Sequence, residues 1–102
     1  MLGIESQVEA GVVHALTAAL YGEITIKDGR VVEDNFDSYR VLTIAEAPRI
    51  ETHLVLSRGD SWGGVGELPH PTTAPAVCNA IFAATGKRLR SLPIKNHDLA
   101  WT

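Results

Sequence analysis

Apolar residues recur at helical spacing near the start of the chain. Neighbours in this series lie three, four or one residue apart, which is the pattern of an amphipathic helix; they are Val8, Val12, Leu16, Ala19 and Leu20. Ser6 and Glu9 stand in the arrangement of a capping box, in which each side chain bonds the other residue's backbone amide. With Gly22 as a stop signal, the sequence predicts a helix over residues 7–20.

Alternating apolar and polar residues follow, and they predict antiparallel strands. The dipeptide Asp28-Gly29 separates two short alternating runs, residues 23–27 and 30–32. Asp-Gly between such runs is a strong signal for a β-hairpin. We therefore expect a hairpin that turns at these two residues.

Two further segments favour additional strands. Residues 35–42 extend the second strand of the hairpin or form a third strand. Residues 50–56 alternate again after the break at Pro48, as expected for a half-buried strand. The sequence thus predicts a hairpin or meander of three to four strands.

The next segment, residues 57–71, has no periodic pattern. A loop of this length inside a small domain is usually functional or disordered. It contains the run Gly63-Gly64-Val65-Gly66-Glu67, which delivers one carboxylate ahead of the second predicted helix. Glycines let the backbone approach a flat or large group closely, so the run suits a base presented beside a cofactor.

A second helix is predicted over residues 74–85, with Pro75 in its first turn and Gly86 at its end. Its apolar residues cover nearly the whole circumference, so the helix needs cover on more than one face. A chain of 102 residues has room for a single core. We therefore expect a dimer or larger homo-oligomer.

Together these elements predict an α+β fold over residues 1–102 as one domain. It comprises a helix, an antiparallel hairpin or meander of three to four strands, a long glycine-rich loop, and a second helix packed on the sheet. Both helices are expected to cover one face of that sheet.

Charge and cysteine content exclude several classes of function. A net charge of −3 argues against a nucleic-acid partner, for which a basic surface is expected. The single cysteine, Cys78, excludes an internal disulfide and an iron–sulfur cluster held by this chain alone. No apolar run is long enough to span a membrane and no export signal is present. We therefore expect a cytoplasmic location, although a partner could carry the chain out of the cytoplasm.

The four histidines are His14, His53, His70 and His97, and they lie too far apart in sequence to form a metal site on one element. We expect surface or boundary positions for them, with His70 near Glu67 because the two share a loop. The chain lacks a phosphate-binding loop, a nucleophile elbow and a complete dinucleotide fingerprint. These absences argue against hydrolases and nucleotide-dependent enzymes.

Five blocks of sequence point to a known family when they are taken in order. Together they resemble the C-terminal end of the molybdopterin-binding large subunit of the molybdenum hydroxylases, the family of xanthine dehydrogenase and aldehyde oxidoreductase. The similarity is greatest to the isoquinoline 1-oxidoreductase beta subunit and extends from Gln7 to about Pro93. The blocks are Gln7-Val8-Glu9-Ala10-Gly11, Ala18-Ala19-Leu20-Tyr21-Gly22-Glu23, Asp37-Ser38-Tyr39-Arg40-Val41, Gly63-Gly64-Val65-Gly66-Glu67 and Ala74-Pro75-Ala76-Val77-Cys78-Asn79-Ala80-Ile81.

The resemblance implies roles for individual residues. Glu67 matches the glutamate that serves the family as catalytic base, removing the proton of the hydroxyl group that attacks the substrate carbon. Gln7 matches a glutamine that touches the pterin, and its amide offers a donor and an acceptor together. Gly64, Val65 and Gly66 match the segment that lies along the cofactor, where the two glycines permit close backbone approach.

The chain also departs from the family pattern. Ala10 stands where the family commonly has glycine, and Leu68 and Pro69 follow the glutamate where a Pro-Gly pair is more usual. Family large subunits are far longer, and their iron–sulfur clusters lie in another subunit or domain.

Two interpretations follow. In the first, the chain is the catalytic-base segment of a split molybdenum hydroxylase that oxidises an N-heterocycle or an aldehyde with water as oxygen source. It is then inactive alone, and it binds molybdopterin only when completed by the remainder of the large subunit and an iron–sulfur subunit. In the second, it is a remnant α+β domain without cofactor that acts as a self-associating or interaction module.

Overall fold

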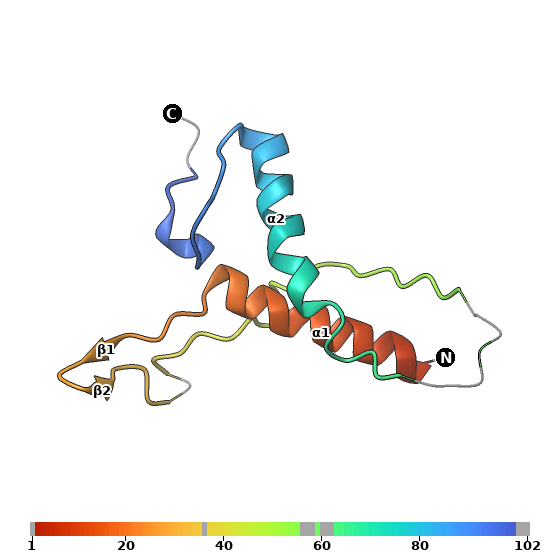
Figure 1. Cartoon of the computed structure of the whole chain (residues 1–102), viewed down its shortest axis with the longest axis horizontal. Helices are drawn as coiled ribbons and strands as arrows, with labels where there is room; N and C mark the ends of the chain where they lie inside the picture. Colours follow the sequence, from red (N-terminus) through yellow and green to blue (C-terminus); the bar gives the residue numbers. More distant parts are fainter. Residues whose placement is uncertain (1, 36, 56–58, 60–62, 100–102) are drawn as a thin grey trace.

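The computed structural model describes residues 2–35, 37–55, 59 and 63–99. The elements are α1 (Leu2–Leu20), β1 (Ile26–Lys27), β2 (Arg30–Val31), α2 (His70–Thr85) and the 3₁₀ helix η1 (Ile94–Asn96). In Figure 1, α2 stands across α1, and the hairpin of β1 and β2 projects beyond the C-terminal end of α1. The helices therefore pack on each other, and the prediction that both cover one face of a sheet is wrong.

Helix α1 is longer than predicted at its start. It begins at Leu2, so Ser6 lies inside the helix and the predicted capping box is wrong. Once a helix is nucleated, adding a residue at its end is favourable, and residues 2–6 include no proline that would prevent it. The predicted end is confirmed. The N–H groups of Tyr21 and Gly22 donate to Thr17 O at 3.0 Å, and a Cβ on Gly22 would lie 2.8 Å from Ala18 Cα.

The hairpin turns at the predicted dipeptide. Asp28 and Gly29 have φ values of 53° and 75°, as a tight hairpin turn requires. Ile26 pairs with Val31 and Lys27 with Arg30, so each strand has only two residues. The hairpin prediction is confirmed, while the strands are shorter than the sequence suggested.

The two additional strands are not present among the described residues. Residues 37–39 and 44–46 form turns, and residues 50–55 are irregular; Leu56, the last residue of the predicted strand, lies outside the described residues. The only sheet there has two strands. Alternation shows that a segment would suit a sheet, but a strand also needs a neighbour to pair with. The prediction of three to four strands is therefore not confirmed.

Helix α2 starts four residues before its predicted first residue and ends where predicted. It begins at His70, which places Pro75 inside the helix and not in its first turn. The Thr73 hydroxyl and N–H both donate to Pro69 O, at 2.6 and 3.1 Å, and so satisfy the carbonyl at the start of the helix. At the end, Gly86 has φ 76° and its N–H donates to Phe82 O at 2.7 Å.

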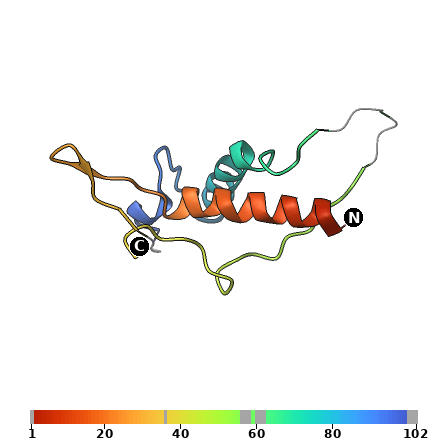
Figure 2. The same ribbon diagram turned by 90° about the horizontal axis from the view of Figure 1, so that it is seen from below.

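The small core lies where the end of α1 meets α2 and the C-terminal segment. Ala19, Leu89 and Ile94 are buried together, and Cys78 packs against them. Figure 2 shows the C-terminal segment lying beside the end of α1. Among the described residues, no large side chain is fully buried. Neither described helix has the length and apolar character that crossing a bilayer requires.

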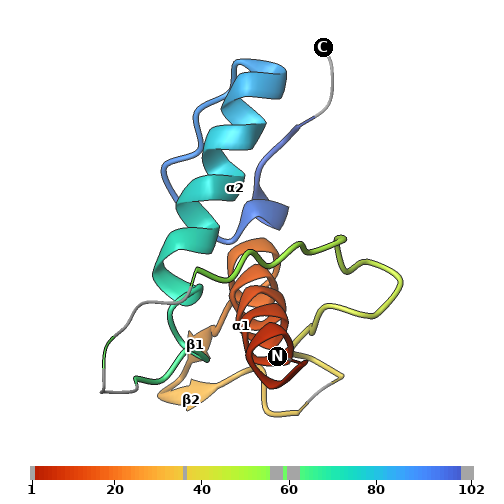
Figure 3. The ribbon, with the colours of Figure 1, turned by 90° about the vertical axis from the view of Figure 1, so that its right-hand side faces the viewer.

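The chain is more open than a self-contained domain of its size. Its radius of gyration is 16.5 Å, against about 13 Å for a compact chain of this length. Its accessible surface is 8082 Å² for a mass of 11.0 kDa, about 2,500 Å² more than is typical of a folded monomer of that mass. Figure 3 shows the hairpin, the segment after it and the top of α2 extending in different directions. Several large apolar side chains are exposed, among them Ile26, Ile44, Val55 and Leu68.

Candidate active site

The loop that precedes α2 lies directly on α1, and Gly11 permits this contact. A Cβ built on Gly11 would lie 2.6 Å from Gly66 O and 3.0 Å from Pro69 Cγ. The first separation is shorter than real Cβ atoms show, and the second is tight, because non-bonded carbon atoms are optimally spaced at about 3.5–4.0 Å. The bare backbone at Gly11 therefore lets the glycine-rich loop reach the helix surface.

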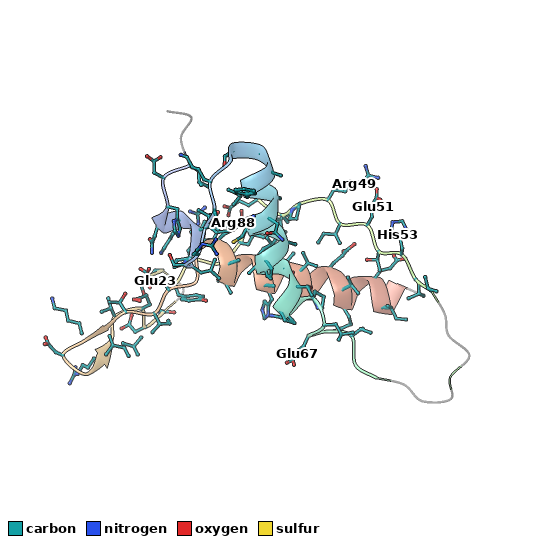
Figure 4. All side chains as sticks on the ribbon, turned by 45° about the horizontal axis from the view of Figure 1, so that its top comes forward. Glu23, Arg49, Glu51, His53, Glu67 and Arg88 are labelled. Atoms are coloured by element: carbon teal, nitrogen blue, oxygen red, sulfur yellow. The ribbon has the colours of Figure 1, made fainter. Side chains whose placement is uncertain are left out.

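This contact creates a cavity of about 350 Å³ between the loop and the helix. Gln7 and His14 line it from α1, and Gly66, Glu67 and His70 line it from the loop and the first residue of α2. A Cβ on Gly66 would lie 3.0 Å from Gln7 Oε1, so the amide of Gln7 and the backbone of Gly66 face each other closely. The Glu67 side chain is exposed, and Figure 4 shows it pointing away from the two helices.

Most of the predicted site residues come together. Gln7, Gly66 and Glu67 share the cavity, and Gly64 lines a neighbouring depression of about 400 Å³ with Gly66 and Glu67. Val65 is half-buried and lines neither of these spaces. The structure thus gathers these residues at one place, while their roles toward a cofactor stay predictions.

Sequence reasoning placed His70 near Glu67, which is confirmed, but it missed His14 and Gly11. The rings of His14 and His70 meet edge to face, with centroids 5.8 Å apart and an angle of 82° between their planes. Gly11 and His14 follow Gln7 by four and seven residues. Residues at these spacings share one helix face, and this signal could have found them.

The residues at this site have the chemistry that one edge of a flat polar cofactor requires. The Gln7 amide faces the Gly66 backbone there, and Glu67 borders the same cavity; amide, carboxylate and backbone groups can accept and donate hydrogen bonds between them. A Cβ on Gly63 or on Gly64 would meet nothing within 4 Å, so the space beside the glycine run is open. The site therefore fits one wall of a molybdopterin pocket, and the other walls must come from outside these residues.

A second polar cluster ties the segment after the hairpin to the end of α1. The Tyr21 hydroxyl donates to Glu46, and Arg40 Nη2 lies 2.7 Å from the same carboxylate. The Thr43 N–H and hydroxyl donate to Glu46 Oε1 at 3.1 and 2.9 Å. The bonds from Tyr21, and then those from Thr43, lower the pKa of Glu46 to about 2, and the bond to Glu46 raises the pKa of Tyr21. These groups bond one another, which indicates a structural role.

Known proteins resemble this chain over most of its length. Isoquinoline 1-oxidoreductase subunit beta of Brevundimonas diminuta is 33% identical over 92 residues, which is 90% of this chain and 12% of that protein. A probable xanthine dehydrogenase subunit from Bacillus subtilis is 33% identical over 101 residues, 95% of this chain and 14% of that protein. The crystal structure of a Cu,Mo-CO dehydrogenase in its carbon monoxide-reduced state matches with a TM-score of 0.70 and 30% identity, covering 83% of this chain and 11% of that chain. No family model matches the sequence.

The chain therefore belongs to the molybdenum hydroxylase family, in which it corresponds to a segment of the molybdopterin-binding large subunits. It spans only 12% and 14% of the two curated relatives named above.

Proposed function

We propose that this chain is the catalytic-base segment of a molybdenum-dependent hydroxylase, acting on an N-heterocycle or an aldehyde with water as the oxygen source. The observation that carries the proposal is the shared cavity of Gln7, Gly66 and Glu67. Gln7 lies far in the sequence from Gly66 and Glu67, yet the contact at Gly11 brings the three residues to one place.

Each of these residues has a task that its chemistry suits. The Glu67 carboxylate accepts a proton at one of its oxygens and is the general base. The Gln7 amide donates to and accepts from the pterin edge, and the backbone of Gly64 and Gly66 lies along it without side chains in the way. When bound, the molybdenum cofactor supplies the redox chemistry of the hydroxylation.

The rest of the large subunit is the partner that completes the site. A base of this kind works at a pKa tuned by a desolvated environment, whereas Glu67 is exposed in this chain. Partner segments must therefore cover it. An iron–sulfur subunit is the further partner, because the lone Cys78 cannot hold a cluster that removes the electrons.

An apolar groove offers a surface for this association. It has a volume of about 560 Å³ and runs between α1, α2 and residues 46–51. Its apolar lining includes Val12, Leu16, Leu20, Ile50, Ala76 and Val77. Covering the excess surface of about 2,500 Å² on this chain would bury roughly 5,000 Å² over both partners, which lies at the upper end of the range for permanent subunit interfaces.

Co-purification tests the proposal. The chain is co-expressed with the rest of a large subunit and the iron–sulfur subunit from the same cell, then purified through a tag on the chain alone. We expect a complex with one molybdenum per copy of the chain, measured by elemental analysis. If the chain is recovered without these polypeptides and without molybdenum, the proposal is wrong.

Exposed apolar residues of α2 support a second candidate, a non-catalytic domain that self-associates. Ala76, Ala80 and Phe82 of α2 are exposed, and in this alternative a second copy of the chain covers them. Light scattering at micromolar concentration distinguishes the two candidates. A stable metal-free homo-oligomer that excludes the large-subunit polypeptide would favour self-association over the enzyme segment.

A further inference from the structure

Two histidines meet beside the Glu67 cavity although they come from different helices. His14 projects from α1 and His70 is the first residue of α2, and their ring centroids are 5.8 Å apart. Both side chains are exposed, so solvent and ions reach them. Nothing in the catalytic proposal uses either imidazole.

We propose that His14 and His70 form a binding site for one divalent transition-metal ion, with Zn²⁺ as the representative ion. Zinc–imidazole bonds are about 2.0–2.1 Å long, so two rings that share an ion have centroids roughly 5 Å apart. The observed separation of 5.8 Å is close to this value. Rotation about the His χ2 bond is broad and soft, and it can turn a nitrogen of each exposed ring toward a common point.

Water molecules or polar groups that line the cavity supply the remaining ligands. Among the residues that the structure describes, no three His, Cys, Asp or Glu side chains converge on one point. The protein therefore supplies two imidazoles, which suit zinc, copper and nickel, and open positions remain. Glu67 and Gln7 line the same cavity as the two histidines, so a bound cation lies beside the segment that carries the predicted base.

Metal binding joins the two helices. His14 belongs to α1, and His70 follows directly on the loop that rests on Gly11. An ion held by both residues clamps that loop to the helix. A ligand that binds only the folded chain stabilises it, so zinc raises the melting temperature of the chain.

The experiment uses the full chain with Cys78→Ala, because a thiolate is a strong zinc ligand in its own right. Zinc is titrated while the imidazole ¹⁵N resonances are followed by NMR, and the affinity is measured by calorimetry. We expect the nitrogens of His14 and His70 to shift together at one zinc per chain. His53, which lies 3.7 Å from Glu51, and His97, which contacts Ser91, should shift little.

Three variants make the assignment specific. His14→Gln and His70→Gln should each weaken zinc binding by about tenfold or more, since even outer-shell losses at metal sites reach that size. The matched control His53→Gln should leave the affinity unchanged. Circular dichroism without metal checks that each variant keeps its helices. The proposal would be overturned if zinc shifted mainly the imidazole ¹⁵N resonances of His53 or His97. It would also be overturned if His14→Gln bound zinc as tightly as the parent chain. The outcome does not depend on the molybdenum cofactor or on any partner subunit.

Discussion

Replacing Gly11 by alanine tests the contact on which the candidate site depends. The new Cβ would lie 2.6 Å from Gly66 O and 3.0 Å from Pro69 Cγ, and the first of these atoms is backbone that cannot turn aside. The loop must therefore shift away from α1. We expect Gly11→Ala to displace the segment that carries Glu67.

Gly3→Ala is the matched control, because Gly3 also lies in α1 and a Cβ there would meet nothing within 4 Å. In an exposed helix, replacing glycine by alanine stabilises by up to about 1 kcal/mol. Inserting a methyl group into a packed contact costs about 1–3 kcal/mol. Gly3→Ala should therefore stabilise the chain, and Gly11→Ala should be less stable than Gly3→Ala by about 1–3 kcal/mol.

Urea denaturation followed by circular dichroism measures both free energies of unfolding. Amide chemical shifts of Gly66 and Glu67 report whether the loop has moved. If Gly11→Ala stabilises as much as Gly3→Ala and leaves those shifts unchanged, the loop does not rest on α1 and the shared cavity is not real.

Three further predictions concern the fold. In the folded chain the pKa of Glu46 is lowered from 4.5 to about 2. The ionised carboxylate therefore stabilises the fold above pH 4.5, and this stabilisation is lost as the pH falls toward 2. In Glu46→Gln, the free energy of unfolding measured by urea denaturation should change less between pH 4.5 and pH 2 than it does in the parent chain. Gly86 has φ 76°, so Gly86→Ala should cost roughly 1–2 kcal/mol in the same assay, and a neutral result would contradict the left-handed cap. Ile94 is 4% exposed and Ile44 is 96% exposed. Ile94→Ala should therefore lower the melting temperature and reduce the free energy of unfolding by about 2–5 kcal/mol. Ile44→Ala should change the free energy of unfolding by no more than about 0.5 kcal/mol. Equal effects of the two substitutions would refute the placement of the core.

The features predicted most accurately from the sequence are those set by residues that are adjacent along the chain. Gly22 and Gly86 stop their helices through local backbone geometry, and Asp28-Gly29 turns the hairpin in the same way. The helix starts were missed because Ser6 and Pro75 are also compatible with positions inside a helix. Two extra strands were predicted that the described residues do not form, because alternation does not reveal whether a pairing partner exists.

The residues of the candidate site were predicted through the family resemblance, but their arrangement in space could not be predicted from the sequence. Gln7 and Glu67 share a cavity only because the loop rests on Gly11, and such a contact depends on how the chain folds back on α1. The pairing of His14 with His70 has the same origin. Each residue looks ordinary in the sequence until the helices are in place.

Turnover of the assembled complex tests the central claim most directly. In a complex with the rest of the large subunit and the iron–sulfur subunit, Glu67→Gln should keep the molybdenum content and lose turnover. Glu9→Gln is the control, because Glu9 is exposed on α1 and does not line the cavity, and it should keep both. Full activity of Glu67→Gln at normal molybdenum content would contradict the role of Glu67 as the base.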